Sequence, residues 1–279
     1  LFAGKWYSYS SNTDLPSDQR EEDGGALVFE SGVLEEPLEI LGAPKCRLRL
    51  KSNKPVAMVA CRLSDISEEG SATRVTYGIL NLTHWEDHSQ PVELPVDQWL
   101  TVEVGLNQIA QRFARGHRVR LSLSTSYWPL VWPSPEPVRL TIDPYSSSLE
   151  LPVRDGDEGP QPRRFEEAVS APLPEHTVLV PAKREWKVTH NLANNEARLT
   201  VVNDDVKQRF EADGWTIHRQ VTEEYSYRRN RYDTLRAEVT AVRQFEQHGW
   251  RAHTETRTLL TSSRTHFRIQ ATLDAYEGD

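Results

Sequence analysis

Two groups of residues have types and spacings that could bind a metal ion: a pair of histidines and a cluster of acidic residues. His84 and His88 stand four positions apart, which on a helix would place both rings on one side. They follow an expected strand and precede a proline-containing loop, so we interpret them as loop histidines that hydrogen-bond neighbouring carboxylates. The acidic cluster could hold calcium through oxygen ligands, but we favour a solvated or arginine-paired turn. Its members are Asp14, Asp18, Glu21, Glu22 and Asp23. We predict no metal site and no cofactor.

The motifs of several common enzyme classes are missing from the sequence. A serine hydrolase of the α/β type needs its nucleophile in a G-x-S-x-G turn between a strand and a helix, and no such pentapeptide occurs. The phosphate-binding G-x-x-x-x-G-K-[ST], the dinucleotide-binding G-x-G-x-x-G and the zinc-binding H-E-x-x-H are absent too. We therefore predict no catalytic residue in this chain and expect it to be inactive alone.

Residues 127–135 are the most unusual local feature, with two tryptophans and three prolines in nine positions. Such a run predicts a stiff, apolar loop. Tryptophan rings can stack on sugars, on proline rings or on a neighbouring domain, and we favour packing within the chain or against another domain. The candidates for contact with another domain or a ligand are Tyr127, Trp128, Trp132, Trp6 and Trp85.

Strands must position these residues, because the hydrophobic pattern has period two over most of the chain. Residues 117–125 place Leu121 and Leu123 on one face and arginines and serines on the other. Arg62 and Asp65 stand where an expected strand ends, and we expect them to form an ion pair that ties the following turn. Turns rich in Gly, Pro and Asp separate the strands, which is typical of an all-β sandwich. Further strands are expected at 26–30, 47–51, 55–64, 73–82, 99–106 and 137–142, and short helices at 107–114 and 162–169.

The composition changes between residues 152 and 174, where prolines, glycines and charged residues predict a surface loop or linker. After residue 180 apolar residues alternate again. Breaks at 229–231, 247–249 and 262–264 predict four consecutive strands in an antiparallel meander with one apolar face. We therefore expect three regions: a β-sandwich at 1–152, a linker at 153–179 and an antiparallel β extension, packed on the sandwich, at 180–279.

Composition excludes some partners and places the chain in a cellular context. Lys and Arg number 33 against 41 Asp and Glu, a net charge of -8, which argues against a nucleic-acid partner. The mean hydropathy is -0.62, and no apolar run approaches the ~20 residues of a membrane-spanning helix. The two cysteines, Cys46 and Cys61, lie in apolar runs and are interpreted as buried thiols, which fits a cytoplasmic location. Because the chain begins at Leu1 without an initiator Met, we expect an excised segment.

Several ordered blocks between residue 4 and about residue 145 carry a family resemblance. They are Asp14–Arg20, Ile40–Pro44, Ala60–Ile66, Leu80–His84, Phe113–Leu121, Ser126–Pro129 and Trp132–Pro135. Together they resemble the C-terminal jelly-roll domain of the CocE/NonD hydrolases, the relatives of X-Pro dipeptidyl-peptidase and cocaine esterase. One departure is Trp85, where the family often has Arg. Residues 180–279 resemble, with thinner motifs, a β extension that follows the jelly roll in some members.

The resemblance implies a galactose-binding-like jelly-roll β-sandwich with an additional antiparallel β-meander. It also implies that the catalytic Ser, Asp and His lie in a preceding α/β-hydrolase domain, so no catalytic residue carries over to this chain. The parent would be a serine hydrolase that cuts ester, acyl or X-Pro amide bonds. On this basis we predict a non-catalytic domain that packs on and stabilises the hydrolase domain of the same polypeptide and shapes access to its site.

Two other functions fit the sequence less well. A carbohydrate-binding or other ligand-binding module would need exposed, coplanar aromatic rings beside polar groups, whereas here the tryptophans alternate with prolines and aliphatic residues. A free-standing scaffold would require the gene product to begin near Leu1. The sequence leaves open whether the protein forms a homo-oligomer, and it does not give the substrate of the parent.

Overall fold

The computed structural model describes residues 18–154 and 164–278, and the chain divides into two compact units, Leu1–Gly159 and Pro160–Asp279. Every named strand pair is antiparallel, and the helical elements are the short α1 (Arg20–Asp23) and the 3-10 turn η1 (Leu82–His84). The predicted all-β sandwich with an antiparallel meander extension is therefore confirmed. No helix in the two described ranges has the length and apolar character that crossing a bilayer requires.

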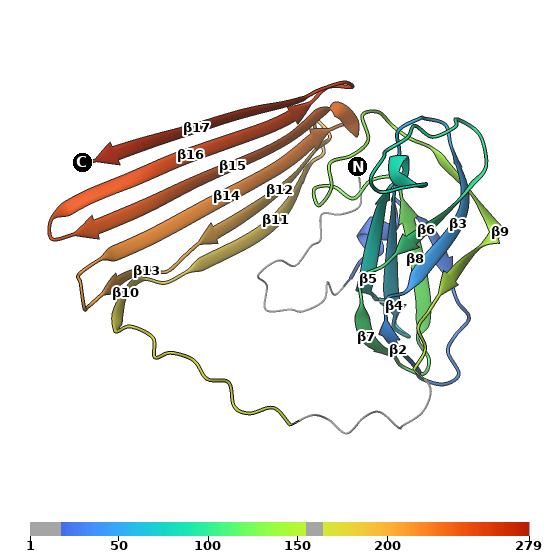
Figure 1. The fold of residues 1–279 in the computed structure, drawn as a ribbon, viewed down its shortest axis with the longest axis horizontal. Coiled ribbons are helices and arrows are strands. Elements are labelled where there is room, and N and C mark those ends of the chain that lie inside the picture. Colours follow the sequence, from blue (N-terminus) through green and yellow to red (C-terminus); the bar gives the residue numbers. More distant parts are fainter. Residues whose placement is uncertain (1–17, 155–163, 279) are drawn as a thin grey trace. The chain divides into compact units, whose positions relative to one another are not determined.

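The first unit is a sandwich of antiparallel sheets (Figure 1). One sheet has the strand order β1-β8-β4-β5, a second β6-β3-β9, and a two-stranded sheet pairs β2 with β7. The strands are β1 Leu27–Glu30, β2 Leu38–Gly42, β3 Lys45–Ser52, β4 Met58–Ile66, β5 Ala72–Asn81, β6 Leu100–Gly105, β7 Ile109–Phe113, β8 Arg118–Ser124 and β9 Leu140–Glu150.

The sandwich core forms where the facing strands present alternate residues to each other. In β4 the odd-numbered Val59, Cys61 and Leu63 are buried in it, and in β3 Leu48 and Leu50 come from the opposite sheet. This is the period-two pattern of a strand with one face on a core. Cys46 and Cys61 are each 0% exposed, so the interpretation as buried thiols is confirmed.

The two expected helices are not found. Residues 109–113 form β7, which pairs with β2 from Leu38↔Phe113 to Gly42↔Ile109. A segment this short is a marginal helix, because nucleation is unfavourable, whereas pairing with β2 satisfies its backbone and buries Phe113 completely. Residues 164–169 have no regular structure, and 162–163 lie outside the described residues.

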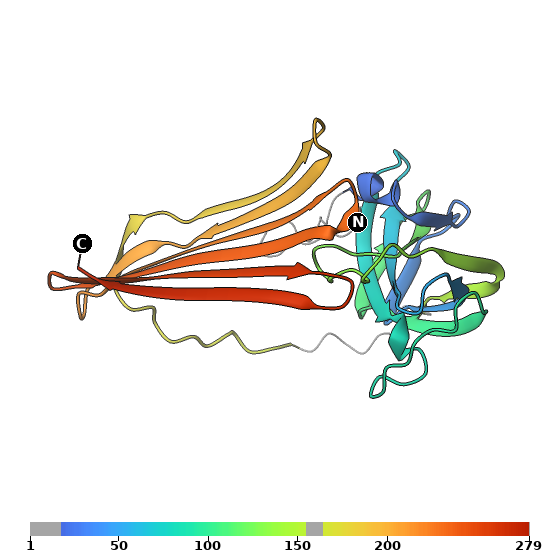
Figure 2. The ribbon, with the colours of Figure 1, turned by 90° about the horizontal axis from the view of Figure 1, so that it is seen from above.

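The second unit is one sheet whose path runs β10-β13-β14-β15-β16-β17, with β11 paired to β12 and β12 also paired to β14. Figure 2 shows its last long strands running side by side, in orange to red. The four predicted consecutive strands are confirmed. The bounds are β10 His176–Val180, β11 Lys183–Asn191, β12 Glu196–Asp204, β13 Lys207–Phe210, β14 Thr216–Arg228, β15 Arg231–Gln247, β16 Trp250–Ser262 and β17 Phe267–Glu277.

Two tight turns set the register of this meander. Arg229 and Asn230 both have positive φ (49° and 55°), as do His248 and Gly249 (47° and 87°). Two-residue turns of this kind match the twist of the strands they join. The register then places apolar residues in rows on one face, and one row consists of Tyr225, Ala237, Leu260 and Ile269.

Candidate functional site

The candidate site lies on the outer face of the sheet β1-β8-β4-β5. Because β4 alternates, its even-numbered Ala60 and Arg62 point away from the core that Val59 and Cys61 enter. Arg62 is nevertheless only 2% exposed. The residues around α1 cover Arg62 through ion pairs. The aromatic loop at 127–135 covers Ala60 through apolar contacts.

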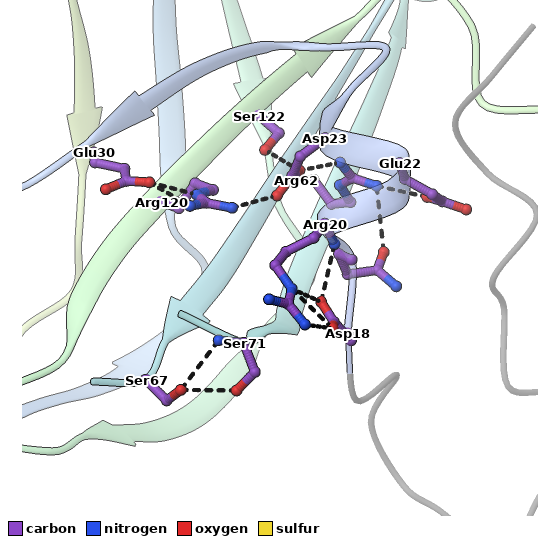
Figure 3. A network of polar contacts seen from close by, with 11 residues as sticks. Asp18, Arg20, Glu22, Asp23, Glu30, Arg62, Ser67, Ser71, Arg120 and Ser122 are labelled. Carbon is purple, nitrogen blue, oxygen red and sulfur yellow. Dashed lines mark hydrogen bonds and ion pairs between the residues drawn. The ribbon is translucent and has the colours of Figure 1, made fainter. Parts of the chain in front are cut away.

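Arg62 is the centre of a buried ion network (Figure 3). Its Nη1 donates to Glu22 Oε2 at 2.5 Å and to Gln19 Oε1 at 3.3 Å, and its Nη2 donates to Asp23 Oδ1 at 2.5 Å. Glu22 and Asp23 are 4% and 8% exposed. The four-residue helix α1 thus both covers the Arg62 guanidinium and supplies the two carboxylates that neutralise it.

Asp23 connects Arg62 to the neighbouring strand β8. Arg120 Nη1 donates to Asp23 Oδ2 at 2.6 Å, and the Ser122 hydroxyl donates to Asp23 Oδ1 at 2.7 Å. Arg120 also pairs with Glu30, its partner across β1 and β8. Each charge in the network therefore faces an opposite charge, which is the condition under which buried ions are tolerated.

The expected ion pair between Arg62 and Asp65 is wrong. Asp65 instead lies 2.8 Å from His117 Nδ1, whereas Arg62 binds Glu22 and Asp23. The reason is geometric: residues three apart on one strand point to opposite faces of the sheet. By contrast, the arginine-paired interpretation of the acidic turn is confirmed for Asp18, which pairs with Arg20, and for Glu22 and Asp23. Asp14 lies outside the described residues.

The aromatic loop is anchored on the same outer face. Tyr127 packs with Met58 and Ala60, its hydroxyl accepts a hydrogen bond from Arg74 Nη1 at 2.8 Å, and its ring lies 5.5 Å from that of Tyr77. Burial raises the pKa of the Tyr127 hydroxyl, so the neutral phenol is the form that the fold holds.

The second half of this anchor is a pair of tryptophans. The Trp128 and Trp132 rings meet edge to face, with centroids 4.9 Å apart and planes at 87°. Trp128 is 2% exposed and Trp132 is half-buried. Between them, Leu130 and Val131 are half-buried and pack on the cluster of Met58, Ala60 and Tyr127.

The five aromatic candidates are therefore not equivalent. Tyr127 and Trp128 are buried, at 1% and 2% exposed, so they serve as supports within the chain. Trp132 and Trp85 are half-buried; Trp85 follows η1 and packs against the sandwich core. Its buried Nε1 has no hydrogen-bond partner within the described ranges. Trp6 lies outside the described residues.

The described residues hold no group of three His, Cys, Asp or Glu side chains that could bind a metal ion. His84 Nδ1 lies 3.0 Å from the backbone oxygen of His88, so the expectation of a carboxylate partner is wrong for His84. Two histidine–aspartate pairs occur, His117–Asp65 at 2.8 Å and His218–Asp204 at 2.7 Å. In the described structure neither histidine is hydrogen-bonded to a serine or cysteine that it could activate.

Sequence reasoning missed Arg74, Arg120 and Glu30 as members of this site. A signal was present for Arg120: Arg62, Arg118 and Arg120 stand at even positions of 58–66 and 118–124, where the odd positions are mostly apolar. Outward arginines of that kind need carboxylates when another segment covers them, and the acidic turn at 18–23 supplies these to Arg62 and, through Asp23, to Arg120.

The buried charges of the Arg62 network are thus paired within this chain. Residues 1–189 match the family model described as the X-Pro dipeptidyl-peptidase C-terminal non-catalytic domain. The chain belongs to this family, and the resemblance to the CocE/NonD hydrolases is confirmed. It is a non-catalytic C-terminal domain of that family.

Three similar proteins illustrate the match. Cocaine esterase of Rhodococcus sp. (strain MB1 Bresler) is 25% identical over 116 residues, which cover 41% of this chain and 20% of that protein. A solved α-amino acid ester hydrolase, labelled with selenomethionine, is 28% identical with a TM-score of 0.47, over 49% of this chain and 27% of that one. An aminopeptidase from the marine sediment archaeon Thaumarchaeota archaeon is 20% identical with a TM-score of 0.50, over 56% of this chain and 32% of that one. The chain thus spans a third or less of the length of each of these three proteins.

Proposed function

We propose that this domain packs on the α/β-hydrolase catalytic domain of the same polypeptide, stabilises it and shapes access to its active site. Family membership supports the proposal, because the family is defined as the non-catalytic C-terminal domain of X-Pro dipeptidyl-peptidases. The proposed parent is a serine hydrolase of esterase or dipeptidyl-peptidase type. The named relatives are esterases and an aminopeptidase, which is consistent with that reaction class.

The observation that carries the proposal is the anchored aromatic loop. Tyr127 and Trp128 fix the loop to the sheet from below, and Leu130, Val131 and Trp132 remain half-buried above them. A surface of large apolar side chains that is already rigid loses little conformational entropy when a partner covers it. Tryptophan is also the residue type most often found at the energetic centre of an interface. We therefore assign the contact with the catalytic domain to Leu130, Val131 and Trp132.

The competing sugar-binding function gains no support from the loop. A sugar stacks on an open aromatic face, and both Tyr127 and Trp128 are buried. Trp132 stands perpendicular to Trp128 rather than coplanar with it. A flat platform of neighbouring rings is thus not formed at 127–132.

The test compares Trp132→Ala in two settings, this chain alone and the full-length polypeptide that contains it. In the chain alone, Trp132→Ala should lower the free energy of unfolding by about 2 kcal/mol, because the edge-to-face contact with Trp128 and the half-buried area are lost. In the full-length protein the same substitution should lower the free energy of unfolding by about 2 kcal/mol more, because an interface contact is lost as well. The rates of hydrolysis of an X-Pro p-nitroanilide and of a simple ester should also fall.

The matched control is Trp99→Ala. Trp99 is 41% exposed, directly precedes β6 in another sheet, and its ring lies beside Arg49 and Lys51 at 5.7 and 5.3 Å. Trp99→Ala should lower the free energy of unfolding by the same amount in the chain alone and in the full-length protein. Equal losses for Trp132→Ala in the two settings, with hydrolysis unchanged, would show that the loop serves only the fold of this domain.

A further inference from the structure

The two cysteines of the chain occupy facing sheets of the sandwich. Cys46 is on β3 and Cys61 is on β4, strands that belong to different sheets. Both side chains are 0% exposed and both belong to the same apolar core. Their sequence separation is short, yet the chain crosses from one sheet to the other between them.

The sheets converge beside this pair. Cys61 is registered with Gly78 on β5, and Cys46 is registered with Val104, the residue before Gly105 on β6. A Cβ atom at Gly78 would lie 2.2 Å from the backbone oxygen of Gly105, closer than any real side chain tolerates.

Hydrogen bonds hold the backbones together at the same place. The Asn107 N–H donates to the Tyr77 carbonyl at 3.0 Å, and the Thr76 hydroxyl donates to the Asn107 carbonyl at 2.9 Å. Stacked sheets are ordinarily about 10 Å apart, too far for a disulfide, which needs Cα atoms within roughly 7 Å. At Gly78 and Gly105, one strand away from each cysteine, the two sheets approach much more closely than this ordinary spacing.

The two thiols lie in the same apolar core. The neighbouring Cys46 side chain, together with burial, raises the pKa of the Cys61 thiol. A raised pKa leaves little thiolate at neutral pH, and the thiolate is the reactive form. The folded, reduced pair is therefore slow to react, and oxidation proceeds while the sandwich is folding or locally open.

We propose that Cys46 and Cys61 form a reversible disulfide that joins the two sheets of the sandwich. The oxidant is a small-molecule disulfide such as oxidised glutathione. One cysteine thiolate attacks it and releases one glutathione thiolate, and the second cysteine attacks the resulting mixed disulfide and releases the other. Two thiol protons are lost, one new protein S–S bond forms, and the two electrons reduce the glutathione disulfide to two thiols.

This bond makes the stability of the domain depend on the redox environment. It closes a loop of about 15 residues, and a cross-link of that size restricts the unfolded chain enough to raise the unfolding temperature of the first unit by about 6–12 °C. The reduced domain remains folded, because the thiols are already packed in an apolar core. The two cysteines would thus cross-link the sheets only under oxidising conditions.

The experiment refolds this chain in buffers that range from reduced to oxidised glutathione. The alkylated protein is then analysed by mass spectrometry and by thermal unfolding without reductant. We expect an intramolecular Cys46–Cys61 peptide in the oxidised samples and a rise in unfolding temperature of the stated size. The control Cys46→Ala should unfold at the same temperature in both buffers.

Three results would overturn the proposal: two alkylated cysteines across the whole range, glutathione adducts without the internal bond, or only intermolecular bonds. If Cys46→Ala does not fold, the wild-type peptide map and its reversal by dithiothreitol still decide the question.

Discussion

Asp23→Ala is the most informative perturbation of the buried network. The substitution removes the carboxylate that accepts from Arg62, Arg120 and Ser122, while both arginines stay in place. Arg62 is 2% exposed, so its charge cannot turn to water when half of its pairing is lost. Breaking a buried ion pair from one side costs about 3–5 kcal/mol, because the remaining charge is left uncompensated. We expect a loss of stability of that size.

The control is Asp18→Ala, which also removes an arginine-paired carboxylate from the same turn. The Asp18–Arg20 pair is open to solvent, with side chains 37% and 59% exposed. Exposed pairs contribute about 0–1 kcal/mol. The two variants thus differ in burial rather than in chemistry.

The assay is urea unfolding, with hydrogen exchange of the β4 and β8 amides to report on the first unit alone. A double-mutant cycle with Arg62→Met tests whether the loss comes from the pairing. If the loss in free energy of unfolding for Asp23→Ala is within about 1 kcal/mol of the loss for Asp18→Ala, the network does not stabilise this face of the sheet and the reasoning from burial is refuted.

Two more predictions test the close contacts of the sandwich. Gly78→Ala should lower the free energy of unfolding by about 2 kcal/mol or more and suppress the proposed Cys46–Cys61 bond, because the new methyl group meets the Gly105 backbone. The control Gly32→Ala, which has nothing within 4 Å of the added methyl group, should change it by under about 0.5 kcal/mol in the same urea assay. Burial raises the pKa of Tyr127 in the folded state, so the neutral phenol stabilises the fold. This contribution to the free energy of unfolding is complete below the pKa near 10 of tyrosine in the unfolded chain and is lost as the pH rises further. Stability measured from pH 9 to 11 should fall less steeply in Tyr127→Phe, and an unchanged slope would contradict this assignment.

Local patterns in the sequence were enough to predict most strands. The alternation in 117–125 predicted β8, and the breaks in the C-terminal region predicted the turns of the last four strands, where Arg229, Asn230 and Gly249 take positive φ. These features depend on neighbours in the chain, through side-chain alternation and turn geometry. The segment 109–113 was predicted wrongly because its partner, β2, lies about 70 residues earlier in the chain.

The aromatic loop and the arginines were visible in the sequence, but their roles were not. Trp128 and Trp132 look alike in the sequence, and packing alone separates a buried support from a half-buried contact. The boundaries 1–152, 153–179 and 180–279, the packing of the extension, the cytoplasmic location and the oligomeric state stay predictions.

The sequence by itself determined most of the strands, the turns between the last four of them, the absence of a nucleophile motif and the family. Tertiary structure decided that Arg62 pairs with Glu22 and Asp23 rather than Asp65, and that Cys46 and Cys61 share one core between two sheets. The physical reason is that strand alternation fixes only the face to which a side chain points. What covers that face is set by segments about 40 residues away or on the opposite sheet, which only the folded chain brings together.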